Sequence, residues 1–395
     1  MNGGTEGNCA AAFEGFVRPR VVFGAGSIER IAAVAAETTP RNILVVTDPG
    51  IVAAGHVGRV VELLKQGTSA RIHVFDGVHE NPDSELVAEC ARFAASVSPD
   101  LLIGLGGGSS LDTAKGCNFV LTNGGVMQDY WGYGKADKPM LPLIAVPTTA
   151  GTGSETQSYA LIADARTHQK MACGDPKAAA RAAILDPALT LSMPRAVAAR
   201  TGLDTVTHAV ETAVTRRRNA FSSLFSREAF CLAHESLPRV LEEPADVAAR
   251  GRMLLASAYA GIAIETSMLG AAHSLANPLT ARFNLFHGQA VGMMLPAVVQ
   301  YNAEDPAAAE IYAGLARAGG LCDDSTSTAA AVQRLIHRLR LLLQRCQMPG
   351  SLRDCGIEES DLDALSLEAA RQWTAQFNPR PVTAADLRAL YAAAL

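Results

Sequence analysis

Several features that would assign this 395-residue chain to a particular class are missing from it. The eight cysteines include no C-x-x-C pair, which argues against a thiolate zinc site or a disulfide framework and suits a reducing cytosol. No uninterrupted apolar run approaches the roughly 18 residues that a membrane-spanning helix needs. The N-terminal stretch lacks the basic start and long apolar core of a signal peptide. We therefore expect a cytoplasmic protein with no membrane partner.

An excess of positive charge is missing as well. The formal net charge is −5, so electrostatics give no reason to expect nucleic acid as a partner. Hydrophobic residues make up 49% of the chain, and its length exceeds what one hydrophobic core usually serves. We expect two domains with ample cores.

The first half of the chain alternates short apolar runs with helical segments of about ten residues, a pattern typical of βαβ units. After about residue 194 the segments are long, rich in alanine and leucine, and helical in period. The predicted fold is an α/β domain with a parallel sheet over 1–193, followed by an all-α domain over 194–395. Each expected strand lies within one of the segments 16–23, 41–51, 70–78, 100–108, 140–155 and 181–194.

The stretch GLGGGSSLDTAKG, residues 104–116, has three consecutive glycines between an expected strand and an expected helix. Ser109 at the N-cap with Asp112 three residues later resembles a capping box. A glycine turn before a helix N-terminus offers free N–H groups and suits a phosphate. The alternative is a tight turn without a ligand. The stretch matches neither G-x-G-x-x-G nor G-x-x-x-x-G-K-[ST], so the motif alone names no nucleotide.

Other polar residues also follow expected strands. Asp48 and the loop PTTAGTGSE, residues 147–155, both come at strand carboxyl ends, as the glycine triplet does. In parallel sheets ligands bind past these ends, so the three segments are expected to converge on one crevice.

Four residues of the second half could hold a metal. Asp204 and His208 are four residues apart on one expected helix face. His273 and His287 are fourteen residues apart, and Pro278 is expected to break the helix between them. One carboxylate and three imidazoles suit a divalent transition metal with room for a substrate oxygen. Taken singly, an Asp–His pair is more often a surface pair, and His273 more often a core histidine.

Together these features resemble the iron-containing, metal-dependent group III alcohol dehydrogenase family over nearly the whole chain. The resemblance rests on motifs in the family's order: VVFGAG, VVTDPG, GLGGGSSLDTAK, PTTAGTGSE, ILDPALTLSMP, TGLDTVTHAVE, GAAHSLANPL, HGQAVGMMLP and FNPRPVTAADL. It implies a dehydroquinate synthase-like architecture, with an N-terminal α/β domain that binds NAD(P), a helical metal-binding domain and a cleft between them.

The resemblance also implies roles for individual residues. The pyrophosphate of the cofactor is expected on Gly106, Gly107, Gly108 and Ser109, with Asp48 near the adenosine ribose and Asn81 beside the cofactor. Further cofactor contacts are implied for Thr148, Thr149, Thr152, Ser154 and Lys170. The implied metal ligands, through which catalysis acts, are Asp204, His208, His273 and His287.

Two positions concern the substrate. The family commonly has a second histidine four residues after the third ligand, where this chain has Asn277, which cannot titrate near neutral pH. Arg282 stands where an apolar or aromatic residue is expected. It is either a surface arginine or a clamp for an anionic aldehyde.

The resemblance implies reversible hydride transfer between NAD(H) and a primary alcohol or aldehyde, with a metal that polarises the carbonyl oxygen. NAD is preferred because a carboxylate at Asp48 would repel the extra phosphate of NADP, the alternative cofactor. The metal is expected to be Fe²⁺, with Zn²⁺ as the alternative, and the chain to form a homodimer or higher homo-oligomer. Other readings stay open: a reductase of an anionic carbonyl of the maleylacetate or phosphonoacetaldehyde type, a zinc glycerol-type dehydrogenase, or a non-catalytic nucleotide-binding sensor.

Overall fold

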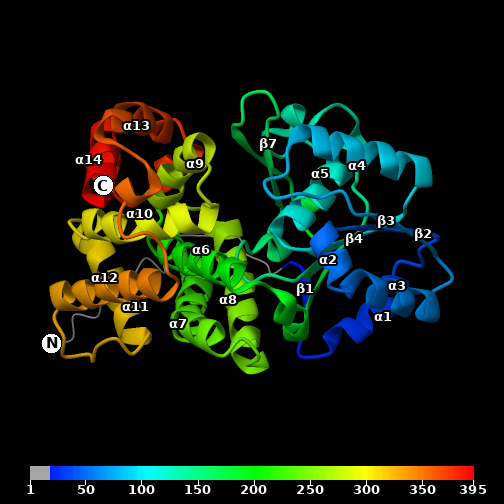
Figure 1. The fold of residues 1–395 in the computed structure, drawn as a ribbon, viewed down its shortest axis with the longest axis horizontal. Helices are drawn as coiled ribbons and strands as arrows, with labels where there is room; N and C mark the ends of the chain where they lie inside the picture. Colours follow the sequence, from blue (N-terminus) through cyan, green and yellow to red (C-terminus); the bar gives the residue numbers. More distant parts are fainter. Residues whose placement is uncertain (1–17) are drawn as a thin grey trace. The chain divides into compact units, whose positions relative to one another are not determined.

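The computed structural model describes residues 18–395, which form two compact units (Figure 1). The first unit comprises Arg18–Ala198 and Glu243–Ala258, and the second comprises Ala199–Glu242 and Tyr259–Leu395. The two domains predicted from the sequence, 1–193 and 194–395, stay a prediction. Of the expected strand over 16–23, residues 16 and 17 lie outside the described part.

The first unit contains a six-stranded sheet in the order β1-β9-β6-β4-β2-β3, and every strand pair in it is parallel. β2, β4, β6 and β9 are almost entirely buried, which explains why they read as unbroken apolar runs. The strands are β1 (Arg20–Phe23), β2 (Asn42–Val46), β3 (Arg71–Phe75), β4 (Leu101–Gly106), β6 (Leu143–Pro147) and β9 (Ala182–Leu185).

Helices cover both faces of this sheet (Figure 1). Alternate strand residues face opposite sides: Val45 packs in one core with residues of α1 and α3, and Leu44 in another with residues of α4 and α5. The helices of the first half are α1 (Ile31–Ala36), α2 (Pro49–Ala53), α3 (His56–Gly67), α4 (Ser84–Val97) and α5 (Gly108–Asn123), with short 3₁₀ turns η1 (Ser27–Arg30), η2 (Met127–Tyr130), η3 (Ser154–Thr156), η4 (Pro176–Ala178) and η5 (Pro187–Ser192).

A second sheet was not predicted. It has the order β5-β8-β7, and β7 pairs with β8 in antiparallel fashion. Its strands are β5 (Gly132–Tyr133), β7 (Tyr159–Ala163) and β8 (Lys170–Gly174). Ile162, Met171 and Cys173 pack in a core with Phe119 of α5. Because these strands are short and pack on a helix distant in sequence, local periodicity gave no clear signal for them.

The predicted capping box at Ser109 and Asp112 is wrong. α5 begins two residues earlier than expected, with Gly107 at the N-cap and no side-chain cap. Asp112 is then the fifth residue of the helix, too far along to reach the free N–H groups of the first turn. Its carboxylate accepts a hydrogen bond from Ser154 instead.

From residue 195 onward the described chain is helical and contains no strand, as predicted. The helices are α6 (Arg195–Val214), α7 (Ala220–Glu242), α8 (Val247–Ser267), α9 (Ala271–Phe283), α10 (His287–Asn302), α11 (Pro306–Ala318), α12 (Thr328–Arg345), α13 (Leu362–Ala370) and α14 (Ala384–Ala394), with η6 (Arg353–Cys355), η7 (Glu359–Asp361) and η8 (Trp373–Phe377).

The predicted break at Pro278 is also wrong, because α9 continues through this residue. A proline inside a helix removes one hydrogen bond, a cost that burial of the surrounding helix can offset. The helix ends at Phe283, and Asn284 adopts a left-handed conformation with φ 55°.

Within residues 18–395, α8 is the one helix whose length and apolar composition match those of a membrane span. The structure buries 72% of its most apolar window, as is typical of a core helix.

Candidate metal and cofactor sites

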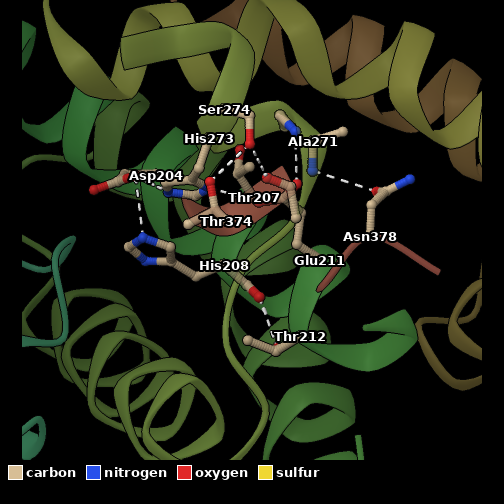
Figure 2. Close-up of polar contacts among 12 residues, drawn as sticks. Asp204, Thr207, His208, Glu211, Thr212, Ala271, His273, Ser274, Thr374 and Asn378 are labelled. Carbon is tan, nitrogen blue, oxygen red and sulfur yellow. Dashed lines mark hydrogen bonds and ion pairs between the residues drawn. The ribbon is translucent and has the colours of Figure 1, made fainter. Parts of the chain in front are cut away.

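One face of α6 carries three ionisable side chains of the second unit. Asp204, His208 and Glu211 are spaced at intervals of four and three residues, which places them on the same side of the helix. Figure 2 shows all three among the side chains around His273. His208 Nε2 lies 3.4 Å from Asp204 Oδ1.

The other two predicted ligands come from the first turns of two further helices. His273 is the third residue of α9, and His287 is the first residue of α10. Their Nε2 atoms lie 3.7 Å and 4.0 Å from Asp204 Oδ1. The structure thus brings all four predicted metal ligands together around one carboxylate oxygen.

The donor set fits a divalent transition metal. In a tetrahedral site with bonds of about 2.1 Å, neighbouring ligand atoms lie about 3.4 Å apart. The donor atoms of Asp204, His208 and His273 all lie within 4.8 Å of one another. Among the described residues, Asp204 Oδ1 and His273 Nε2 are buried without a hydrogen-bond partner. Two buried polar atoms that face each other without a hydrogen-bond partner destabilise the fold unless a cation lies between them.

The charges of the cluster shift its pKa values in opposite directions. Burial opposes ionisation of Asp204, but the three neighbouring imidazoles outweigh it and hold the pKa of this carboxyl below its usual range. Burial likewise opposes protonation of His273, but the carboxylates of Glu211 and Asp204 raise the pKa of this imidazole to about 9. The cluster without a metal therefore attracts positive charge, from protons or from a cation.

Glu211 was not singled out from the sequence. It is buried, and its Oε2 lies 2.5 Å from His273 Nδ1, the ring nitrogen that does not face Asp204 (Figure 2). The available signal was its spacing: Glu211 ends the motif TGLDTVTHAVE, seven residues after Asp204.

In the first unit, the three glycines of the predicted phosphate turn differ in whether the protein itself leaves space for a side chain. Gly106 has φ 148°, and a Cβ there would lie 2.4 Å from Ser110 Oγ. A Cβ at Gly108 would lie 2.5 Å from Thr152 Cγ2. At Gly107 the nearest atoms would be those of Thr149, at an ordinary contact distance of 3.4 Å. The protein atoms therefore leave space for a side chain at position 107. A ligand bound against the backbone there would need that space and so would require glycine.

Asp48 lies beside this turn. Its Oδ1 caps α2 by accepting a hydrogen bond from the N–H of Ile51 at 3.1 Å, and its Oδ2 accepts one from Ser110 Oγ at 3.2 Å. A Cβ on Gly106 would lie 3.1 Å from Asp48 Oδ2. The expected convergence of these two strand ends is thus observed, and Asp48 also caps α2.

The Thr/Gly loop meets the same strand end. The N–H of Thr148 donates to the carbonyl of Gly106 at 2.9 Å, and Thr148 Oγ1 is buried without a hydrogen-bond partner in the described chain. Thr152 Oγ1 accepts a hydrogen bond from the N–H of Ser154 at 3.2 Å. A glycine turn with room at Gly107 and an unsatisfied hydroxyl beside it fits the pyrophosphate of a dinucleotide.

Ser154 is held by groups of the protein. Its Oγ accepts from Lys115 Nζ at 2.9 Å and donates to Asp112 Oδ1 at 2.6 Å. No role was assigned to Lys115 from the sequence, although it lies in the glycine motif of residues 104–116; in the structure it is fully buried at the middle of α5. Burial raises the pKa of Asp112, and the charge of Lys115 opposes that rise.

The remaining predicted cofactor residues lie in the same unit. Ser109 is the second residue of α5, and Lys170 is the first residue of β8, paired with Ala163. The positive charge of Lys170 favours the ionised form of Asp112. Asn81 follows β3 in an exposed turn, with φ 53°.

The two predicted substrate residues have protein partners. Asn277 lies one turn after His273 on α9 and donates a hydrogen bond from Nδ2 to Gln372 Oε1 at 3.0 Å. Arg282 is exposed, and its guanidinium pairs with the carboxylate of Glu368, with Nε 3.0 Å from Oε2. A substrate anion would have to compete with Glu368 for Arg282.

Comparison with known proteins agrees with this architecture. The family model described as iron-containing alcohol dehydrogenase matches residues 18–187, and the C-terminal model of the Fe-containing alcohol dehydrogenase family matches residues 198–395. The chain is 32% identical to alcohol dehydrogenase 4 of Schizosaccharomyces pombe, over 95% of this chain and 87% of that protein. It is 31% identical to the NAD-dependent methanol dehydrogenase of Bacillus methanolicus, over 94% of this chain and 97% of that protein.

A solved structure gives the same result for the fold. The alcohol dehydrogenase from Oenococcus oeni superposes with a TM-score of 0.93 at 30% identity, covering 97% of this chain and 100% of that chain. Together, the family models, the relatives and the shared fold establish that the chain belongs to the iron-containing alcohol dehydrogenase family.

Proposed function

We propose that this oxidoreductase interconverts a primary alcohol and its aldehyde, with NAD(H) as cofactor and Fe²⁺ at the four-residue cluster, Zn²⁺ being the alternative metal. The observation that carries the proposal is the convergence of three imidazole Nε2 atoms within 4.0 Å of the buried oxygen Asp204 Oδ1. Imidazole and carboxylate ligands accept either metal, and a site with four protein ligands would take a substrate oxygen by expanding to five-coordination.

A bound metal would supply Lewis-acid polarisation of the substrate oxygen, and the nicotinamide would accept or supply the hydride. The protein residues bind and orient. Asp204, His208, His273 and His287 hold the metal in this proposal. The pyrophosphate binds to the backbone of Gly106, Gly107, Gly108 and Ser109. Further contacts with the cofactor come from Asn81, Thr148, Thr149, Thr152 and Lys170. Ser154 acts through its hydrogen bonds to Lys115 and Asp112, which fix the loop.

NAD(H) is preferred over NADP(H) in this proposal because of Asp48. Its carboxylate lies at the end of β2 beside Gly106, where ribose hydroxyls can donate to it and a ribose phosphate would be repelled. The NAD-dependence of the Bacillus methanolicus relative supports the same choice.

For the substrate, we propose that Asn277 lines the binding site, since it lies one helical turn from His273. The clamp role of Arg282 for an anionic aldehyde stays a prediction, weakened by its pairing with Glu368. The proposal also includes a cytoplasmic location and a homodimeric or larger assembly.

The test is metal analysis of the purified protein combined with NAD⁺ reduction by a panel of primary alcohols and NADH oxidation by neutral and anionic aldehydes. His273→Ala should lower metal content and turnover together. His337→Ala, the same change at an exposed histidine of α12, is the matched control and should lower neither. Metal and cofactor binding without turnover of any substrate would favour the sensor alternative, and turnover of anionic aldehydes alone would favour an anionic-carbonyl reductase.

A further inference from the structure

We propose that Glu211 is a positioning residue that holds His273 in the tautomer able to bind the metal. This inference rests on the proposed function, since it assigns a role toward the same metal. Glu211 Oε2 lies 2.5 Å from His273 Nδ1, and both side chains are at least 95% buried.

The chemistry of the two groups determines where the proton lies. A carboxylate only accepts hydrogen bonds, so the ring nitrogen that faces it must carry hydrogen. His273 Nδ1 therefore donates to Glu211, which leaves the lone pair of a neutral ring on Nε2. This is the nitrogen that lies 3.7 Å from Asp204 Oδ1 in the cluster. In the opposite tautomer, an N–H group would point at the cation and block ligation.

Glu211 also holds the backbone that carries His273. Its second oxygen, Oε1, accepts a hydrogen bond from the N–H of Ala272 at 2.7 Å. One carboxylate thus fixes both the ring and the residue before it. A Cβ at Gly270 would lie 3.0 Å from Glu211 Oε1, so the absence of a side chain there lets the carboxylate approach the helix start.

The late motif FNPRP supplies a second support at the same helix start (Figure 2). Asn378 is buried, and its Oδ1 accepts hydrogen bonds from the N–H of Ala271 at 3.3 Å and from Asn302 Nδ2 at 3.1 Å. Asn378 Nδ2 in turn donates to Asn302 Oδ1 at 2.7 Å. The first N–H groups of α9 are therefore satisfied by Glu211 and Asn378, and the His273 ring starts from a fixed backbone position.

The test measures metal binding and the tautomer directly. Metal-free full-length protein is titrated with Co²⁺ and with Zn²⁺ against a competing chelator. Loss of a partner of a metal-bound histidine typically weakens metal binding 10- to 100-fold, so we expect about that loss for Glu211→Gln. Glu155→Gln is the matched control, since it makes the same change at another buried glutamate, in the first unit, and should leave the metal affinity unchanged.

Nitrogen-15 NMR of histidine-labelled, Zn²⁺-loaded wild type gives a second readout, which needs no variant. We expect a His273 ring that is protonated at Nδ1 and ligated through Nε2. Glu211→Asp, which keeps an acceptor-only group, should lose less metal affinity than Glu211→Gln.

Three results would overturn the inference. One is a Glu211→Gln protein that binds Co²⁺ within twofold of wild type, with an unchanged visible spectrum. Another is a His273 ring that is protonated at Nε2 in the Zn²⁺-loaded wild type. The third is a wild type that binds neither metal, which would overturn the proposed function and this inference together, whereas the first two leave the proposed function intact.

Discussion

Lys115 Nζ is fully buried inside the first unit and donates hydrogen bonds to the carbonyl of Ser154 at 2.6 Å and to Ser154 Oγ at 2.9 Å. A third hydrogen bond reaches the carbonyl of Tyr159 at 2.8 Å. The ammonium therefore ties α5, which starts at the glycine turn, to the loop that follows β6. Asp112 Oδ1, 3.9 Å from Lys115 Nζ, balances its charge.

Replacing this lysine should be costly. Lys115→Met keeps the length of the side chain but leaves Asp112 as a buried charge without its counter-ion, and we expect a loss of about 3–5 kcal/mol in the free energy of unfolding. Lys65→Met is the control, since Lys65 forms an exposed pair with Glu62 on α3 and should cost less than about 0.5 kcal/mol. Urea denaturation of both variants measures the difference. Equal losses in the free energy of unfolding would show that the contacts of Lys115 stabilise the protein no more than an exposed ion pair does.

Glu155 should make stability depend on pH. Burial raises the pKa of this carboxyl from 4.5 to about 7. Between these values the folded protein holds a proton that the unfolded chain has lost, so the free energy of unfolding falls as pH rises. The total contribution is up to about 3 kcal/mol.

Glu155→Gln cannot titrate, so its stability relative to wild type should increase from pH 5 to pH 8. Denaturant midpoints of both proteins across this range give the comparison. A difference between them that is constant with pH would mean that Glu155 keeps an ordinary pKa.

Gly107→Ala tests the phosphate turn more cleanly than a change at either neighbouring glycine. The structure has room for a Cβ at this position, with the nearest atoms at 3.4 Å, so the fold should be retained. A methyl group there would occupy the space through which the pyrophosphate approaches the backbone, and we expect the Kd for NAD⁺ to rise at least about tenfold, equivalent to about 1.4 kcal/mol.

Gly58→Ala, in α3 with no atom near the added Cβ, is the matched control and should leave NAD⁺ binding unchanged. Calorimetric titration with NAD⁺ distinguishes the two variants. Unaltered binding by the Gly107→Ala protein would remove the glycine turn from the cofactor site.

Asp48→Ser tests the choice of cofactor while keeping a side chain that can cap α2. Removing the carboxylate should raise kcat/KM for NADPH relative to NADH by about tenfold, as expected for about 1.4 kcal/mol of relieved repulsion. Asp305→Ser, which changes another helix-capping aspartate at the start of α11, should leave the cofactor ratio as in wild type. A wild type that prefers NADPH would leave Asp48 with only its capping role at α2.

The sequence by itself was sufficient for the large sheet. Its strands are buried on both faces, so each reads as an apolar run followed by a turn, and that signal is local to a few residues. The helical second half is equally legible from its period. The four residues of the metal cluster could be nominated because Asp204 and His208 share a helix face and because the motifs around His273 and His287 resemble those of the family.

Only the tertiary structure revealed the partners that orient these residues. Glu211 and His273 are 62 residues apart in sequence, and Lys115 and Ser154 are 39 apart. No local period links such pairs, because their contact depends on how separate helices and loops pack. Local sequence likewise did not reveal that Pro278 stays inside α9 or that Arg282 forms an ion pair with Glu368. Local patterns specify which elements form, whereas the pairing of buried charges and hydrogen bonds depends on which side chains the packed fold brings within about 3 Å.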